Sequence, residues 1–256
     1  MHTFVSDGAA IAYRVDGAGP PVVLAHALGV HAEANWLRSG WIDRLLRTQR
    51  SVVSFDLRGH GRSDRRHEIS AYGAGVHEDV VRLLDHLGIE RADFMGYSLG
   101  AWVGIGVLAT HPDRLNACVL GGCGWQGIDR QHNLFLADAL DGIRSGDASL
   151  QWQAEMTVRL VDACGNDPKA LAALLRSDWA VPLDRVRHNE RPVRLVSGAN
   201  DLLVPDPEDM RRRIGSSTAV VIPDADHRTA LVHADFAAVV LALLEEHGLR
   251  RCTRAR

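Results

Sequence analysis

The sequence lacks the features of a membrane or secreted protein. In its 256 residues no uncharged apolar run reaches about 18 residues, so neither a membrane-spanning helix nor a membrane partner is expected. The first residues have neither the basic start nor the apolar core of a signal peptide. The four cysteines form no Cys-x-x-Cys pair, which favours reduced thiols in a cytoplasmic protein over a zinc site or a disulfide framework. They are Cys118, Cys123, Cys164 and Cys252.

Lysine is nearly absent from the chain. Lys169 is the only lysine, and the other basic residues are arginines. The formal net charge is -3, which argues against a surface that binds nucleic acid. Apolar residues make up 46% of the chain and charged residues 24%, as in an ordinary globular protein. A chain of this length can form one large α/β domain with a substantial core.

Short apolar runs alternate with helical patterns along most of the chain. The runs are short enough for buried parallel strands, and the helical patterns place their apolar residues on one face. This alternation predicts a parallel sheet with helices on both faces. After a hairpin over 3–15, strands are expected over 22–25, 51–55, 117–120, 193–197 and 218–222 and from residue 92, and helices over 36–47, 76–87, 99–111, 207–214 and 233–247.

The alternation stops between residue 121 and about residue 191. Helical patterns recur there near 132–144, 149–161 and 168–176, with no strand pattern between them. Gly165–Pro168 has the composition of a turn followed by a helix cap. We therefore interpret the region as a helical insertion within a single domain, residues 1–256.

Gly96, Ser98 and Gly100 form a Gly-x-Ser-x-Gly motif between an expected strand and an expected helix. A serine at the tip of such a turn exposes its hydroxyl, and the close backbone segments require small residues two positions before and after it. The helix that follows directs free N–H groups at the serine, including that of Leu99, which would stabilise an oxyanion. The motif predicts a serine nucleophile.

Asp201 and His227 follow two later strands, as Ser98 follows its own strand. Because the carboxyl ends of parallel strands share one edge of the sheet, we expect the three side chains to converge, with the serine oxygen within hydrogen-bond reach of His227. A neutral imidazole can take the serine proton, and a carboxylate on its far nitrogen fixes the tautomer. Asp129, in the loop after strand 117–120, is an alternative acid.

With these motifs the chain resembles the α/β-hydrolase superfamily over most of its length outside the insertion. The resemblance implies a mostly parallel eight-stranded sheet flanked by helices, built from residues 1–121 and 192–256, and a helical cap over residues 122–191. It also implies a second oxyanion donor, the backbone N–H of Leu28. Members of the family usually have glycine where this chain has Ala27. The resemblance rests on His26–Gly29, Asp56–Ser63, Gly96–Gly100 and the loops of Asp201 and His227.

Tryptophans gather near the expected site. Trp125, Trp152 and Trp179 fall in the expected cap, and Trp102 lies one helical turn after the serine. They could line an apolar pocket that holds an alkyl or aromatic group of a substrate. They could equally be buried where the cap helices meet the sheet. Both interpretations stay open on the sequence alone.

Together these features predict a serine hydrolase that needs no metal or other cofactor. Its substrate would be a small, uncharged or weakly polar ester, lactone or thioester, with an apolar or aromatic acyl group possible. The resemblance also allows cleavage of enol-lactones or of carbon–carbon bonds. The alternative is a non-hydrolytic enzyme that uses the same triad, such as a cyclase, a lyase, an acyltransferase or a cofactor-free perhydrolase, and a ligand-binding receptor is a third hypothesis. The sequence does not specify an oligomeric state.

Overall fold

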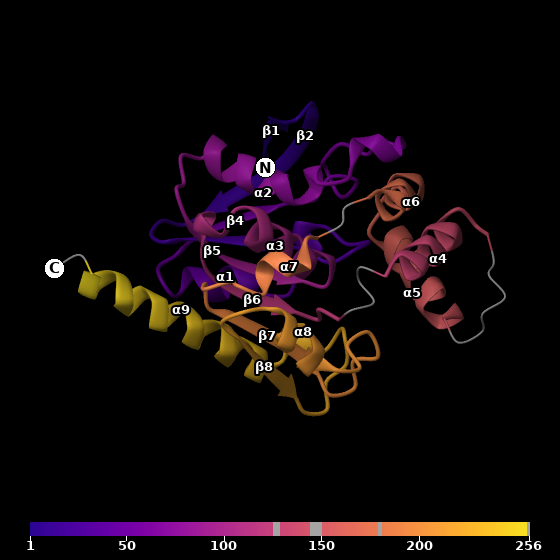
Figure 1. Cartoon of the computed structure of the whole chain (residues 1–256). Helices are drawn as coiled ribbons and strands as arrows, with labels where there is room; N and C mark the ends of the chain where they lie inside the picture. The colour runs from indigo at the N-terminus through magenta and orange to yellow at the C-terminus, as the bar shows by residue number, and fades with distance from the viewer. Residues whose placement is uncertain (125–128, 144–149, 179–180, 255–256) are drawn as a thin grey trace.

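The structure is a computed structural model that describes residues 1–124, 129–143, 150–178 and 181–254, with side chains up to residue 246. Its centre is a sheet of eight strands in the order β1-β2-β4-β3-β5-β6-β7-β8 (Figure 1). The β1–β2 and β2–β4 pairs are antiparallel and the others are parallel, which confirms the expected sheet. The strands are β1 (His2–Ser6), β2 (Ala9–Asp16), β3 (Pro21–Ala25), β4 (Ser51–Phe55), β5 (Ala92–Tyr97), β6 (Leu115–Gly121), β7 (Val193–Gly198) and β8 (Ser217–Ile222).

Helices cover both faces of this sheet. Alternate residues of a strand point to opposite faces, so Val23 joins the core beneath α2, α3 and α8, whereas Val22 joins the core beneath α1 and α9. Among the described helices, none is both long and apolar enough to cross a lipid bilayer. The helices are α1 (Trp41–Leu46), α2 (Gly75–His86), α3 (Leu99–Thr110), α8 (Pro207–Arg213) and α9 (Ala234–Arg254).

The expected helix over 36–47 is interrupted in the structure. A short π-helical turn, Glu33–Leu37, precedes α1, and Gly40 lies between them with a φ of 79°. Glycine adopts this left-handed conformation without the steric cost that a Cβ would add. The apolar spacing that suggests one helix therefore belongs to two short segments that are joined by a turn.

The described part of the chain between β6 and β7 forms helices and connecting turns, with no strand. Helices α4, α5 and α6 pack against one another and stand together beyond one end of the sheet, whereas α7 packs against α3 (Figure 1). The expected turn before α6 is confirmed: Asp167 accepts the backbone N–H groups of Lys169 and Ala170, and Pro168 is the first residue of the helix. The bounds are α4 (Arg130–Leu140), α5 (Gln151–Ala163), α6 (Pro168–Arg176) and α7 (Leu183–Val186).

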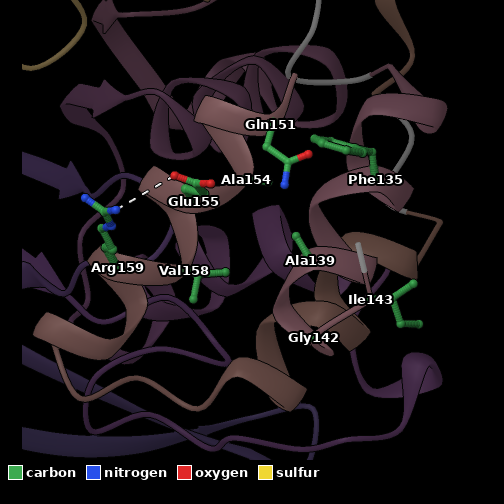
Figure 2. A pocket seen from close by; sticks show the side chains of 9 residues that line it. All are labelled: Phe135, Ala139, Gly142, Ile143, Gln151, Ala154, Glu155, Val158 and Arg159. Atoms are coloured by element: carbon green, nitrogen blue, oxygen red, sulfur yellow. Dashed lines mark ion pairs between the residues drawn. The ribbon is translucent and has the colours of Figure 1, made fainter. Parts of the chain in front are cut away.

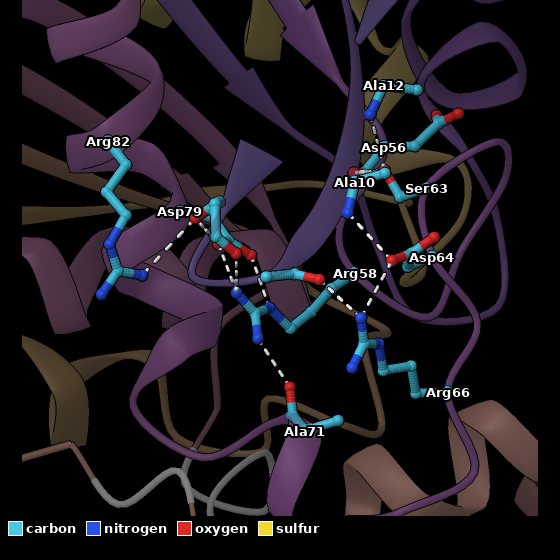
Figure 3. Close-up of polar contacts among 12 residues, drawn as sticks. Ala10, Ala12, Asp56, Arg58, Ser63, Asp64, Arg66, Ala71, Asp79 and Arg82 are labelled. Carbon is cyan, nitrogen blue, oxygen red and sulfur yellow. Dashed lines mark hydrogen bonds and ion pairs between the residues drawn. The ribbon is translucent and has the colours of Figure 1, made fainter. Parts of the chain in front are cut away.

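A buried ion pair holds the loop after β4 against α2 (Figure 3). Arg58 donates two hydrogen bonds to the carboxylate of Asp79, from Nε at 2.7 Å and from Nη2 at 2.6 Å, and both side chains are at most 5% exposed. Nη1 of Arg58 donates to the carbonyl oxygen of Ala71, and the hydroxyl of Ser6 donates to Asp79. Gly75 leaves room for the guanidinium, because a Cβ there would lie 2.9 Å from Nη1.

The same loop is hydrogen-bonded to β2 by its own side chains (Figure 3). The hydroxyl of Ser63 accepts the backbone N–H of Ala12 at 2.9 Å and donates to the carbonyl oxygen of Asp56. The carboxylate of Asp64 accepts the N–H of Ala10 at 2.9 Å. These bonds satisfy backbone groups that lie outside the ladder of the sheet, and they fix the course of residues 56–64.

Replacing Arg58 by methionine should leave the Asp79 carboxylate buried without its cation. Breaking a buried pair in this way costs about 3–5 kcal/mol, so the free energy of unfolding measured in urea should fall by that amount. Adding Asp79→Leu should restore part of the loss, because an apolar pair can replace a buried ion pair at little cost. Arg211→Met, in an exposed pair with Glu208, is the control and should cost less than about 1 kcal/mol. A double variant no more stable than Arg58→Met would contradict this account.

Candidate active site

Ser98 occupies the sharp turn between β5 and α3. Its φ of 52° and ψ of -115° lie in a region that residues other than glycine rarely adopt. The packing holds it there: a Cβ on Gly96 would overlap the carbonyl oxygen of Gly100, and a Cβ on Gly100 would overlap that of Ala25. The spacing of small residues that the sequence shows is thus a steric requirement of this turn.

Asp201 and His227 form a hydrogen-bonded pair. Oδ2 of Asp201 lies 2.8 Å from Nδ1 of His227, and the Asp201 side chain is fully buried while that of His227 is 23% exposed. The second oxygen of Asp201 accepts the N–H of Leu203 at 2.9 Å. The hydroxyl of Tyr97 donates to the carbonyl oxygen of His227 at 2.7 Å. The imidazole is therefore oriented through Nδ1, and Nε2 bonds to no described group.

The loops of Ser98 and His227 meet beside the end of β6. The N–H of Ser98 donates to the carbonyl oxygen of Gly121 at 2.8 Å, and a Cβ on the next residue, Gly122, would lie 2.8 Å from Cε1 of His227. The expected hydrogen bond between the Ser98 hydroxyl and His227 is not formed among these described residues. Catalytic hydrogen bonds of this kind are often long in the free protein and tighten in the complex with substrate.

Asp129, the alternative acid, has a different place. It is the N-terminal cap of α4, where its Oδ1 accepts the N–H of His132 at 2.8 Å. Asp226, next to His227, accepts the N–H groups of Arg228 and Thr229 and so shapes its own loop. The carboxylate against the imidazole is that of Asp201.

In the loop after β3, the N–H of Leu28 lies between two bonded amides and is itself unbonded within the part of the chain that the structure describes. Its neighbours are occupied: the N–H of Ala27 donates to Oδ1 of Asn35 at 3.1 Å, and the N–H of Gly29 donates to Nε2 of His60 at 3.1 Å. Among the described residues, the N–H groups of Leu28 and Leu99 donate to no acceptor. Two unbonded amides, one from the loop and one from the first turn of α3, are what an oxyanion would need.

Comparisons with known proteins identify the family. A family model described as the alpha/beta hydrolase fold matches residues 20–160, just over half of the chain. The chain belongs to the α/β-hydrolase family.

The matches to related proteins cover most of the length of this α/β-hydrolase. A Caulobacter protein whose name describes the carbamate hydrolase RutD is 29% identical over 223 residues, which cover 75% of this chain and 80% of that protein. A hydrolase structure from Pseudomonas aeruginosa is 25% identical, with a TM-score of 0.72, and the match covers 95% of this chain and 97% of that one. An enol-lactonase structure from Burkholderia xenovorans is 24% identical, with a TM-score of 0.71. The match covers 95% of this chain and 100% of that one, which shows the shared fold.

The tryptophans of this hydrolase have separate environments. Trp102 is 2% exposed and belongs to the core beneath α3, which matches the buried alternative for that residue. Trp152 lies on α5 and is 43% exposed. Trp125 and Trp179 lie outside the described residues.

An apolar groove of about 220 Å³ lies between α4 and α5 (Figure 2). Phe135 and Ala139 of α4 face Ala154 and Val158 of α5 across it. Sequence reasoning missed this groove, since these residues have the ordinary spacing of amphipathic helices and only the pairing of the two helices opens it. The full lining is Phe135, Ala139, Gly142, Ile143, Gln151, Ala154, Glu155, Val158 and Arg159.

Helix α5 contacts loops on both sides of the serine turn. Near its end, Val161 lies 3.1 Å from the position that a Cβ on Gly29 would take. One turn or more earlier, Sδ of Met156 lies 4.0 Å from Nη1 of Arg228, the residue after His227. Since Gly29 follows β3 and Arg228 follows β8, α5 runs between the two loops that border the turn of Ser98.

Two buried imidazoles support the loop after β3. Nε2 of His26 accepts the N–H of Leu57 at 2.9 Å, so Nδ1 carries the proton and donates to the carbonyl oxygen of Ala27. His60 likewise accepts through Nε2, from Gly29. Burial lowers the pKa of His26 from 6.5 to about 4 and lowers that of His60 well below its usual value. Both rings are therefore neutral acceptors at neutral pH.

Stability should depend on these rings between pH 6.5 and about 4. A folded-state pKa below the unfolded one means that unfolding takes up a proton, so stability is full above pH 6.5 and is lost as the pH falls toward 4. In chemical denaturation across this window, His26→Asn should reduce the slope by up to about 1.4 kcal/mol per pH unit. An unchanged slope would mean that His26 does not remain neutral in the folded protein.

Proposed function

We propose that this α/β-hydrolase is a serine hydrolase with Ser98 as nucleophile, His227 as general base and Asp201 as the residue that orients His227. The observation that carries the proposal is the Asp201–His227 pair at 2.8 Å, which leaves Nε2 without a partner among the described residues. A carboxylate on Nδ1 selects the tautomer whose Nε2 can accept a proton and stabilises the imidazolium that results. No step of this chemistry requires a metal or another cofactor.

The proposed reaction has two halves. Nε2 of His227 takes the proton of Ser98 while the serine oxygen bonds to the acyl carbon, and the N–H groups of Leu28 and Leu99 stabilise the oxyanion. The imidazolium then protonates the leaving group, and the bond between that group and the acyl carbon breaks. In the second half, His227 takes a proton from water, the hydroxide attacks the acyl-enzyme, and the returned proton releases Ser98.

The substrate in this proposal is a small ester, lactone or thioester with an apolar group. The groove between α4 and α5 supports it, because Val158 lies one helical turn from Val161, which contacts the loop of Leu28. Its volume of about 220 Å³ is below the 300–1,000 Å³ of drug-sized sites, so an alkyl chain or a single ring would fill it. Its charged residues, Glu155 and Arg159, pair with each other at 3.8 Å (Figure 2). The names of the carbamate hydrolase and the enol-lactonase, which describe acyl-group cleavage, agree with this class.

Removal of any triad member should abolish most activity on an aryl acetate. Ser98→Ala and His227→Ala should each lower turnover by about 10⁴–10⁶-fold because the two act as a unit, and Asp201→Asn by about 10⁴-fold because it changes the tautomer. A fluorophosphonate should label the native protein and Ser70→Ala, the control at an exposed serine, but not Ser98→Ala. If Ser98→Ala kept its rate on the physiological substrate while ester hydrolysis vanished, His227 would act alone, and a lyase or cyclase would replace this proposal.

Filling the groove should shorten the acyl chains that the enzyme prefers. Ala139→Phe places a ring in the groove, and losing space for about two methylenes at about 0.8 kcal/mol each should lower kcat/KM for an octanoyl ester, relative to an acetyl ester, about tenfold. Ala163→Phe adds the same ring at an exposed position of α5 outside the groove and is the matched control. Equal chain-length profiles in the two variants would show that the acyl group binds elsewhere.

A further inference from the structure

Asn166 connects the helical insertion to the loop after β3. It lies in the turn between α5 and α6 and is only 6% exposed. Its Nδ2 donates to the carbonyl oxygens of Gly29 at 2.8 Å and Val30 at 3.1 Å, and its Oδ1 accepts the N–H of Gly61 at 2.8 Å. One buried side chain therefore bridges the insertion, the loop after β3 and the loop after β4.

The two residues on either side of Leu28, Ala27 and Gly29, are held by four side chains. Oδ1 of Asn35 accepts the N–H of Ala27, and His26 donates to the carbonyl oxygen of Ala27 at 2.8 Å. His60 accepts the N–H of Gly29, and Asn166 donates to the carbonyl oxygen of Gly29. The carbonyl oxygen of Ala27 belongs to the same peptide group as the Leu28 N–H, and the contacts of Gly29 hold the chain on the other side of Leu28, so together these contacts restrict the direction of that N–H.

Of these four side chains, Asn166 is the one that the insertion supplies. The turn that carries it is docked by further contacts: Arg65 donates to the carbonyl oxygen of Gly165 at 3.0 Å, and His67 lies 2.8 Å from Asp167. These two contacts are exposed, whereas the contact of Asn166 with Gly29 is buried. Of these contacts, the buried hydrogen bond from Asn166 to Gly29 is the one that reaches the loop of Leu28.

We infer that Asn166 is a positioning residue: by holding the carbonyl oxygen of Gly29 it aims the Leu28 N–H at the oxyanion, so that docking of the insertion and stabilisation of the transition state are coupled. The inference rests on the proposed function. An oxyanion donor acts on the charge that develops in the transition state, so misdirecting it lowers kcat more than it raises KM. Loss of a whole donor costs about 10²–10³-fold in kcat, and misalignment of a retained donor costs less.

The test compares Asn166→Ala and Asn166→Asp with Asp167→Ala. Asn166→Asp keeps the acceptor for Gly61 but removes both donors. Asp167→Ala removes the cap of α6 and the exposed docking contact with His67, but touches neither Gly29 nor Val30, so it tests docking without the buried bond. On an aryl ester, both Asn166 variants should lose about 10–100-fold in kcat with KM changed less than about threefold. The inhibition constant of an aryl trifluoromethyl ketone should rise in proportion to the fall in kcat/KM. Asp167→Ala should lower the melting temperature and keep kcat.

The outcomes separate this inference from the proposed function. If Ser98→Ala is inactive but the Asn166 variants keep kcat, or if Asp167→Ala loses kcat equally, Asn166 has only a structural role and the inference is wrong. If Ser98→Ala stays active, the proposed function fails and the inference fails with it. If Asn166→Ala does not fold, Asn166→Asp, which preserves size and the Gly61 contact, decides the matter.

Discussion

The close approach of α3 to the end of β3 is the constraint on which the site depends. Gly100 lies so near the carbonyl oxygen of Ala25 that no side chain fits between them. Backbone strain of the kind found at Ser98 costs about 1–3 kcal/mol and persists only where the surroundings impose it. Here the surroundings are the core around α3, in which every residue from Leu99 to Ala109 is buried, and this packing holds Ser98 in its strained conformation. Because the loop of Leu28 begins where β3 ends, the same contact brings the start of that loop beside the first turn of α3.

Polar side chains then support the loops where regular secondary structure ends. Asp56 accepts the N–H groups of Ala32 and Arg62 at 2.8 and 2.9 Å, and the imidazoles of His26 and His60 accept from loop amides. Buried backbone groups outside a ladder need such partners, because leaving one unpaired costs as much as a lost hydrogen bond. These bonds fix the loops at the carboxyl ends of β3 and β4, so that individual backbone N–H groups in them keep a defined direction.

Local patterns in the sequence were sufficient for the parts of this molecule that depend on local rules. Apolar runs located the strands, and the spacing of Gly96 and Gly100 located the turn, since both follow from sterics within a few residues. Trp102 could not be placed, because α3 is apolar on every side and its pattern indicates no preferred face. Asn166 has the local signature of a turn, and its contact with Gly29 spans 137 positions of the chain, which no local pattern encodes.

The insertion separates two tasks along its length. The groove is lined by residues of α5 from Gln151 to Arg159, whereas Asn166 follows the end of that helix at Ala163. Under the proposed function, the side chains of α5 that line the groove can vary with the acyl group without touching the bond between Asn166 and Gly29. Changes near Val161, which packs beside Gly29, would alter both tasks together. Specificity can therefore change at one end of the helix while the oxyanion geometry is preserved at the other.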